Sequence, residues 1–222
     1  DQVAGRASDR LDRLVAAGRP FYLQVGFIEP HRLSGQRDAP GVMGFLGDHI
    51  EPDSELGITV PQYLLDDEGA RTEVAELQGA VRHMDRAAGR ILDRLDELGL
   101  RDSTLVIFTT DHGVALPRAK CTLYDPGLEV ALIMRWPSRG WSGGVVRHEL
   151  ISNVDIVPTL LETMGLDAGG DLHGRSFAPL LGNGPGRTGR SDYTPRAEIF
   201  GEITYHDYYD PRRCIRTERY KL

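Results

Sequence analysis

The chain has 222 residues, of which 40% are hydrophobic and 27% are charged, a composition that fits one globular domain or one large domain with an appendage. Its formal net charge of −7 argues against nucleic acid or an anionic membrane surface as the main partner. No apolar run approaches the ~18 residues that a membrane-spanning helix requires, so the sequence predicts no such segment.

The first quarter of the chain is predicted to hold one helix, one strand and one irregular segment. Apolar residues at helical spacing predict a helix over residues 5–18, and Gly18 closes it. The apolar run Pro20–Ile28 predicts a strand, and the polar tetrapeptide Glu29–Arg32 follows it. Residues 33–59 are rich in Gly, Pro and Asp without a clear period, which is typical of a functional loop or of a disordered segment.

The longest predicted element is a helix over Ala70–Leu98. Acidic residues at Asp66–Glu68 suit its positive N-terminal end, and Gly99 follows it as a terminating glycine should. His83 and Asp85 lie beside its apolar stripe and are predicted to be solvated or satisfied locally. The stripe steps by three and four positions, as expected for packing on one face: Val74, Leu77, Val81, Met84, Ala88, Ile91, Leu95 and Leu98.

A second strand is predicted within Thr104–Gly113, T-L-V-I-F-T-T-D-H-G. Its continuous β-branched and aromatic run predicts burial on both faces. Ligands of open α/β sheets gather beyond the carboxyl ends of the strands, so Asp111 and His112 lie where chemistry is usually done. Gly113 would let the backbone turn sharply or approach a ligand closely. The alternative is a strand that ends in an ordinary polar turn.

The rest of the chain is predicted to add strands and one short helix. A loop that carries Lys120, one of only two lysines in the chain, precedes a strand at Glu129–Trp136. A short helix is predicted within Ile151–Met164, and strands at Ala197–Ile203 and Cys214–Leu222. Strands that alternate with helices predict an α/β fold, and the last two strands predict an antiparallel appendix.

The polar residues near the predicted strand ends are of types that bind metal ions and anions. A carboxylate beside an imidazole, as at Asp111 and His112, can hold a divalent cation, although two ligands do not complete a site. His31, Arg32 and Lys120 can hold an anion, although Lys120 could equally be an ordinary surface lysine. A metal and cationic side chains around a tetrahedral anion are the general arrangement for phosphoryl or sulfuryl transfer.

Four segments carry a resemblance to a known family. They are P-F-Y-L-Q-V-G-F-I-E-P-H-R from Pro20, L-V-I-F-T-T-D-H-G from Leu105, K-C-T-L-Y-D-P-G-L-E-V-A-L-I-M-R-W-P from Lys120 and N-V-D-I-V-P-T-L-L-E-T-M-G from Asn153. In this order and at these separations they resemble the sulfatase family of the alkaline-phosphatase superfamily. L-H-G-R-S-F-A-P-L-L and the tail from Tyr205 are most similar to the N-sulfoglucosamine sulfohydrolase (heparan sulfamidase) branch.

The resemblance implies an α/β fold: an alkaline-phosphatase-like mixed sheet flanked by helices, with a small C-terminal antiparallel appendix. Residues 1–190 would be the C-terminal portion of the catalytic domain, without its N-terminal part, and residues 191–222 would begin the antiparallel subdomain. Asp111 matches a family metal ligand, and His112 stands at the neighbouring ligand position. Members of the family usually bind Ca²⁺, while the imidazole of His112 leaves Mn²⁺ or another divalent ion open.

The resemblance also implies roles in substrate binding and catalysis. Lys120 matches the residue that contacts the sulfate and the leaving-group oxygen, and His31 matches a sulfate-contacting histidine; both are therefore expected to be catalytic. Glu29 and Arg32 fall where the sulfamidase branch places substrate-recognition residues. The implied substrate is a sulfate ester or sulfamate of a sugar such as N-sulfoglucosamine, with a sulfated carbohydrate as the partner.

The family nucleophile has no counterpart in this sequence. It is a formylglycine made from the Cys or Ser of a C/S-x-P-x-R motif, and no such motif occurs in the 222 residues. The expected explanation is that the motif lies in a missing N-terminal part. Two alternatives remain: a phosphodiesterase or phosphonate hydrolase of the same superfamily, and a glycan-binding pseudoenzyme without catalytic activity. The scarcity of cysteine is compatible with the bacterial cytoplasm or periplasm.

Overall fold

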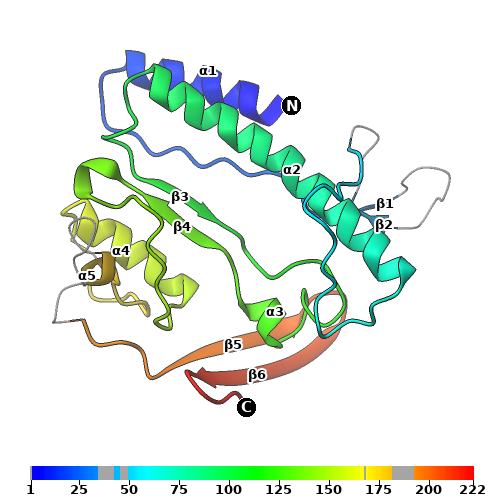
Figure 1. The fold of residues 1–222 in the computed structure, drawn as a ribbon. Coiled ribbons are helices and arrows are strands. Elements are labelled where there is room, and N and C mark those ends of the chain that lie inside the picture. The colour runs from blue at the N-terminus through cyan, green and yellow to red at the C-terminus, as the bar shows by residue number, and fades with distance from the viewer. Residues whose placement is uncertain (1, 35–42, 46–49, 168, 182–192) are drawn as a thin grey trace. The chain divides into compact units, whose positions relative to one another are not determined.

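The computed structural model describes residues 2–34, 43–45, 50–167, 169–181 and 193–222 (Figure 1). The chain divides into two compact units, Asp1–Arg101 and Asp102–Leu222. No helix in these described ranges combines the length and the apolarity needed to cross a bilayer.

Two helices, α1 (Gln2–Ala16) and α2 (Glu68–Glu97), pack against each other in the first unit. Both confirm the helices predicted from periodicity, and α2 begins where the acidic residues indicate. Asp67 is its N-cap, and the Asp67 carboxylate accepts a hydrogen bond of 2.8 Å from the N–H of Ala70. The chain leaves α2 through Gly99 in the left-handed conformation, with a φ of 70°.

The buried face of α2 differs in detail from the predicted stripe. Val81 of the stripe is exposed, whereas Gly79 and Ala80 are buried. A Cβ at Gly79 would lie 2.1 Å from the carbonyl oxygen of Glu51, so a neighbouring segment passes too close for a larger side chain. The buried residues of α2 are Val74, Gly79, Ala80, Ala87, Ile91 and Leu95. Asp85 is exposed and His83 is half-buried.

The strand predicted at Pro20–Ile28 is absent: this segment pairs with no other strand in the described residues. Burial nevertheless alternates from residue to residue between Phe21 and Glu29, as it does in an extended chain with one covered side. Two short strands follow, β1 (Leu33–Ser34) and β2 (Met43–Gly44), which pair antiparallel. Much of the irregular segment predicted at 33–59 lies outside the described residues.

The second unit contains β3 (Val106–Thr109) and β4 (Leu132–Arg135). These strands pair antiparallel from Val106 opposite Arg135 to Thr109 opposite Leu132. The prediction that β3 is buried on both faces was wrong: its residues are half-buried or exposed, and Ile133 on β4 is 64% exposed. The strands of the described ranges form three two-stranded antiparallel sheets, so the predicted mixed sheet is not seen in them.

The second unit also contains short helices. α3 (Asp125–Leu128) was not predicted from the sequence, whereas α4 (Ile156–Thr163) confirms the predicted short helix. α4 follows the 3-10 turn η2 (Asn153–Asp155), and a second such turn, η1 (Pro137–Arg139), follows β4. The remaining helix, α5 (Ala178–Leu181), packs against α4.

The C-terminal part forms an antiparallel hairpin of β5 (Glu198–Tyr205) and β6 (Tyr209–Thr217). The appendix is therefore antiparallel, as predicted, but its second strand begins earlier than the expected Cys214–Leu222. The chain turns after Thr217, whose hydroxyl bonds to both the N–H and the carbonyl of Tyr220. Residues after this turn fold back along β6, where Leu222 and Ile215 exchange two backbone hydrogen bonds.

Candidate metal and anion site

The end of β3 presents Asp111 and His112. The β3–β4 ladder ends at the pair Thr109 and Leu132, and the N–H of Ala131 donates a 3.2 Å hydrogen bond to the hydroxyl of Thr110. Pairing with β4 therefore fixes the backbone just before the two polar residues. The side chain of Asp111 is 87% exposed and that of His112 is 38% exposed, so both are accessible in this unit.

The ring of His112 is oriented by the backbone of the next residue, Gly113. Its Nδ1 lies 2.7 Å from the carbonyl oxygen of Gly113, which only accepts hydrogen bonds, so Nδ1 carries the proton. The other nitrogen, Nε2, lies 3.6 Å from Oδ1 of Asp111. Histidines that bind metals commonly donate their second ring N–H to a backbone carbonyl in this way.

The spacing of these two atoms fits a shared cation. Neighbouring ligands of a hard cation at Ca²⁺ distances lie roughly 3 to 3.7 Å apart, which includes the Asp111–His112 separation. Among the described residues, however, no cluster of three or more His, Cys, Asp and Glu side chains could hold a metal. The two side chains therefore offer part of a coordination sphere, and further ligands must complete it.

Two glycines connect this strand end to the loop that carries Lys120. The N–H of Gly113 donates a 3.1 Å hydrogen bond to the carbonyl of Gly127. A Cβ at Gly113 would lie 1.8 Å from the carbonyl oxygen of Pro126, and one at Gly127 would lie 2.4 Å from that of Ala119. Only glycine fits at either position without moving the backbone, so the two loops interlock through main-chain contacts.

Lys120 lies in a tightly constrained part of that loop. Its N–H donates a 3.0 Å hydrogen bond to the carbonyl of Val114, and the preceding residue, Ala119, is fully buried. Arg118 and Cys121 have φ angles of 62° and 64°, the only non-glycine residues with positive φ in the described chain. Such a conformation is unfavourable for side-chain-bearing residues and tends to occur at functional sites, here on both sides of Lys120.

The other predicted cluster belongs to the first unit. Glu29 and Arg32 are half-buried and His31 is exposed. A turn forms here, in which the N–H of His31 donates a 2.7 Å hydrogen bond to the carbonyl of Ile28. Nδ1 of His31 lies 2.6 Å from the carbonyl oxygen of Arg32 and therefore carries the proton, as in His112.

Arg32 makes structural contacts that sequence reasoning did not predict. Its guanidinium forms a two-point ion pair with the carboxylate of Glu73 on α2, with 3.3 Å between Nη1 and Oε1. The same guanidinium lies 4.2 Å from the centre of the ring of Phe45, which is almost fully buried. These contacts fix the orientation of Arg32 and tie the turn at His31 to α2.

A buried carboxylate in the second unit was also missed from the sequence. Asp155, 1% exposed, accepts hydrogen bonds from the N–H groups of Ser152 and Arg175 at 3.0 and 2.9 Å. It also forms a two-point ion pair with Arg196. Burial alone would raise the pKa of Asp155, but the hydrogen bonds from Arg196 and the two backbone N–H groups outweigh burial and lower that pKa.

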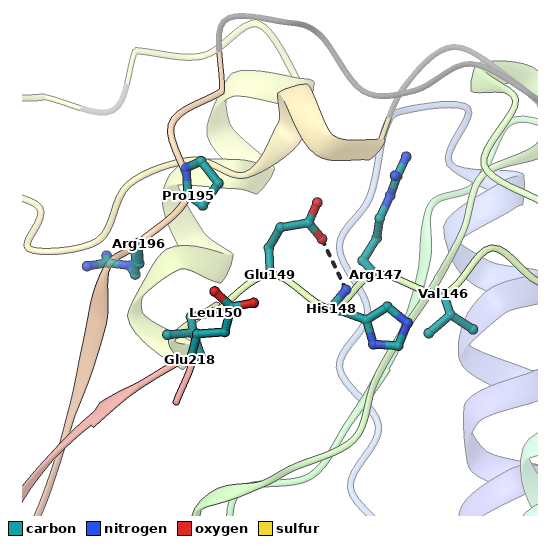
Figure 2. Close-up of a pocket in the computed structure, with 8 residues that line it drawn as sticks. All are labelled: Val146, Arg147, His148, Glu149, Leu150, Pro195, Arg196 and Glu218. Carbon is teal, nitrogen blue, oxygen red and sulfur yellow. Dashed lines mark hydrogen bonds between the residues drawn. The ribbon is translucent and has the colours of Figure 1, made fainter. Parts of the chain in front are cut away.

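A cavity of about 330 Å³ lies beside Arg196 in the second unit (Figure 2). Figure 2 shows the carboxylate of Glu149 directed at the backbone N–H of His148, which donates to it at 3.1 Å. The lining residues mix both signs of charge, and none of them is a predicted site residue. They are Val146, Arg147, His148, Glu149, Leu150, Pro195, Arg196 and Glu218.

Two protein-family models match the chain. The model described as "Sulfatase" matches residues 3–166, and the model described as "N-sulphoglucosamine sulphohydrolase, C-terminal" matches residues 118–222. The N-sulphoglucosamine sulphohydrolase of Homo sapiens is 28% identical over 227 residues, which cover 92% of this chain and 43% of the human protein. The chain therefore spans less than half the length of this relative.

Solved structures agree with these matches. One, from work on glycosaminoglycan metabolism by Bacteroides thetaiotaomicron, superposes with a TM-score of 0.72 and 25% identity, covering 98% of this chain and 47% of that one. A phosphonate monoester hydrolase from Silicibacter pomeroyi superposes with a TM-score of 0.57 and 26% identity, covering 72% and 34% of the two chains. The first similarity includes both units, and it extends to nearly every residue of the chain.

Proposed function

The chain belongs to the sulfatase family, and from this we propose that the protein hydrolyses sulfate esters or sulfamates of sugars, with N-sulfoglucosamine-like groups as the substrate class. The observation that carries the proposal is the overlap of the two family models. The segment matched by the sulfatase model includes Asp111, His112 and Lys120. The segment matched by the N-sulphoglucosamine sulphohydrolase model begins at residue 118, two residues before Lys120. A sulfated carbohydrate is the proposed partner.

Asp111 and His112 are the proposed metal ligands. Their converging oxygen and nitrogen atoms, 3.6 Å apart, and the hydrogen bond from Nδ1 of His112 to Gly113 support this role. A bound Ca²⁺ would supply positive charge that stabilises the sulfate oxygens during transfer. The carboxylate of Asp111 suits Ca²⁺, while the imidazole of His112 also suits Mn²⁺.

Lys120 and His31 are the proposed catalytic residues. The ammonium of Lys120 would bind the sulfate and stabilise the negative charge that develops on the leaving oxygen or nitrogen. His31, with its proton on Nδ1, would accept or donate at Nε2 according to its charge state. Glu29 and Arg32 are proposed to recognise the sugar, and Glu73 would hold Arg32 in a fixed orientation. The family's formylglycine would supply the attacking hydroxyl group.

A release assay tests this proposal. The protein, produced as its gene encodes it, is incubated with N-sulfated and O-sulfated glucosamines, and free sulfate is measured. Release of sulfate from at least one of them is expected, with a turnover number that Lys120→Ala lowers by about 100-fold or more because a charge-stabilising group is lost. Unchanged turnover in that variant would refute the role of Lys120, and no release from any substrate would refute the activity.

Hydrolysis of phosphonate or phosphate esters is a second candidate function. The superposition on the phosphonate monoester hydrolase, over 72% of this chain, favours it. The relative rates on p-nitrophenyl sulfate and p-nitrophenyl phenylphosphonate distinguish the two functions. A preference for the phosphonate would favour this second candidate over the sulfatase activity.

A further inference from the structure

The C-terminal hairpin holds the loop that carries Lys120 through three separate contacts. The guanidinium of Arg212 on β6 donates a hydrogen bond of 3.5 Å to the carbonyl oxygen of Cys121. A Cβ at Gly201 on β5 would lie 2.8 Å from a methyl group of Leu128 and 3.6 Å from one of Leu123. The side chains of the loop therefore pack directly on the hairpin, at the point where β5 has no side chain of its own.

The third contact is an ion-pair cluster around Asp125. Nζ of Lys221 lies 2.7 Å from Oδ1 of Asp125, and Nε of Arg216 lies 3.6 Å from the same oxygen. The ammonium of Lys221 also lies 5.8 Å from the centre of the Tyr124 ring. Two cations from the hairpin and its returning tail thus meet one carboxylate, five residues after Lys120.

The loop is consequently fixed from two sides. Main-chain hydrogen bonds from Gly113 and Lys120 attach it to the strand end, and the hairpin attaches its far side. Between these attachments the backbone passes through the unfavourable conformations of Arg118 and Cys121, which persist only where surrounding contacts impose them. Loss of the hairpin contacts would let the backbone relax and move Lys120.

We propose that Asp125 is a positioning residue, which places Lys120 against the leaving group by binding Lys221 and Arg216 of the C-terminal hairpin. This inference rests on the proposed role of Lys120 in sulfatase catalysis. Asp125 is 55% exposed, and ion pairs at such exposure contribute only about 0 to 1 kcal/mol to stability. Its removal should therefore change turnover far more than it changes folding.

The chain offers a matched control. The carboxylate of Asp66 is 53% exposed and pairs with Arg71 at 2.7 Å, the same separation as between Asp125 and Lys221. Asp125→Asn and Asp66→Asn therefore remove comparable charges from comparable ion pairs, and Asp66 has no proposed role in catalysis. Both variants are made in the protein as its gene encodes it.

Turnover is measured with aryl sulfates whose leaving phenols span a range of pKa values. Asp125→Asn is expected to lower the turnover number about 10- to 100-fold for the most basic leaving groups, because a small misplacement of a catalytic group has effects of this size. The loss should shrink for p-nitrophenyl sulfate, because p-nitrophenol needs little stabilisation as it leaves. Asp66→Asn should leave the turnover number unchanged for every leaving group. A loss that is equal for all leaving groups would overturn the proposal.

Two further measurements separate positioning from a general structural effect. In a Lys120→Ala background, Asp125→Asn should cause less than a twofold further loss, because its effect acts through the missing ammonium. The same factor in both backgrounds would overturn the inference. Hydrogen exchange of the amides at residues 118–124 should rise in Asp125→Asn and not in Asp66→Asn, and unchanged exchange would also overturn it.

The exchange measurement does not depend on catalysis. If the wild-type protein released no sulfate while exchange still rose in Asp125→Asn, the proposed function would fail and the attachment of the loop by the hairpin would stand. If the wild-type protein were active and Asp125→Asn left both the leaving-group dependence and the exchange unchanged, the proposed function would stand and this inference would fail.

Discussion

Replacing Asp155 by asparagine tests how the second unit is held together. The substitution keeps the size of the side chain but removes its charge and turns one acceptor oxygen into an amide that donates. The carboxylate is the common acceptor for Ser152, Arg175 and Arg196, which reach it from three segments of the chain. An amide cannot accept from all of them, so at least one part-buried donor loses its partner.

The expected loss of stability follows from the contacts. Removing one member of a buried ion pair costs roughly 3 to 5 kcal/mol, because the other charge remains buried and uncompensated. The Arg196 side chain retains 20% exposure and can recover some solvation, which reduces this value. We therefore expect Asp155→Asn to lower the free energy of unfolding by about 2 to 4 kcal/mol.

Urea denaturation followed by circular dichroism measures this change, with Asp66→Asn as the control for loss of an exposed carboxylate. The control should change the free energy of unfolding by no more than about 0.5 kcal/mol. A similarly small change in Asp155→Asn, with an unchanged dependence on urea, would refute the view that this carboxylate anchors the unit.

Three further predictions concern pH, packing and metal binding. The pKa of Asp155 is lowered in the folded state from an ordinary value of about 3.8, so the stability that this carboxylate contributes is complete above pH 3.8 and is lost as the pH falls through the folded pKa. Asp155→Asn lacks this contribution at every pH. Acid unfolding, measured by circular dichroism, should therefore begin at a higher pH in the variant than in the wild-type protein. Gly113→Ala should destabilise the protein by about 1 to 3 kcal/mol, because its Cβ would lie 1.8 Å from a backbone carbonyl oxygen, whereas Gly89→Ala, which meets nothing within 4 Å, should stabilise it in the same thermal unfolding assay. Since no cluster of three or more His, Cys, Asp and Glu side chains in the described residues could hold a metal, the 222-residue chain alone should bind Ca²⁺ with a dissociation constant of about 1 mM or weaker. Tight stoichiometric binding in calorimetry would contradict this.

The sequence predicted best those features that depend on neighbouring residues. The length of α2, the acidic residues at its start and its end at Gly99 follow from helical periodicity and from side chains within one turn. The polar pair after β3 also lies where the strand pattern ends. These signals are local, so they can be read without knowledge of tertiary contacts.

Features that depend on distant residues could not be predicted. Asp155 binds partners 20 and 41 residues away, and Arg32 binds a glutamate 41 residues away. Nothing in the local pattern around either residue indicates its partner. The segment Pro20–Ile28 has the composition of a strand, but a strand also needs a neighbour, and composition does not provide one.

The lysines of the chain offer a spectroscopic consequence. The 222 residues contain only Lys120 and Lys221, and these lie on opposite sides of the contact between the loop and the C-terminal hairpin. Reductive methylation with ¹³C-formaldehyde keeps the charge of each ammonium and would label just these two side chains and the terminal amine. Their methyl resonances would then report, without any substrate, whether a ligand or a substitution changes the surroundings of the loop, of the tail, or of both.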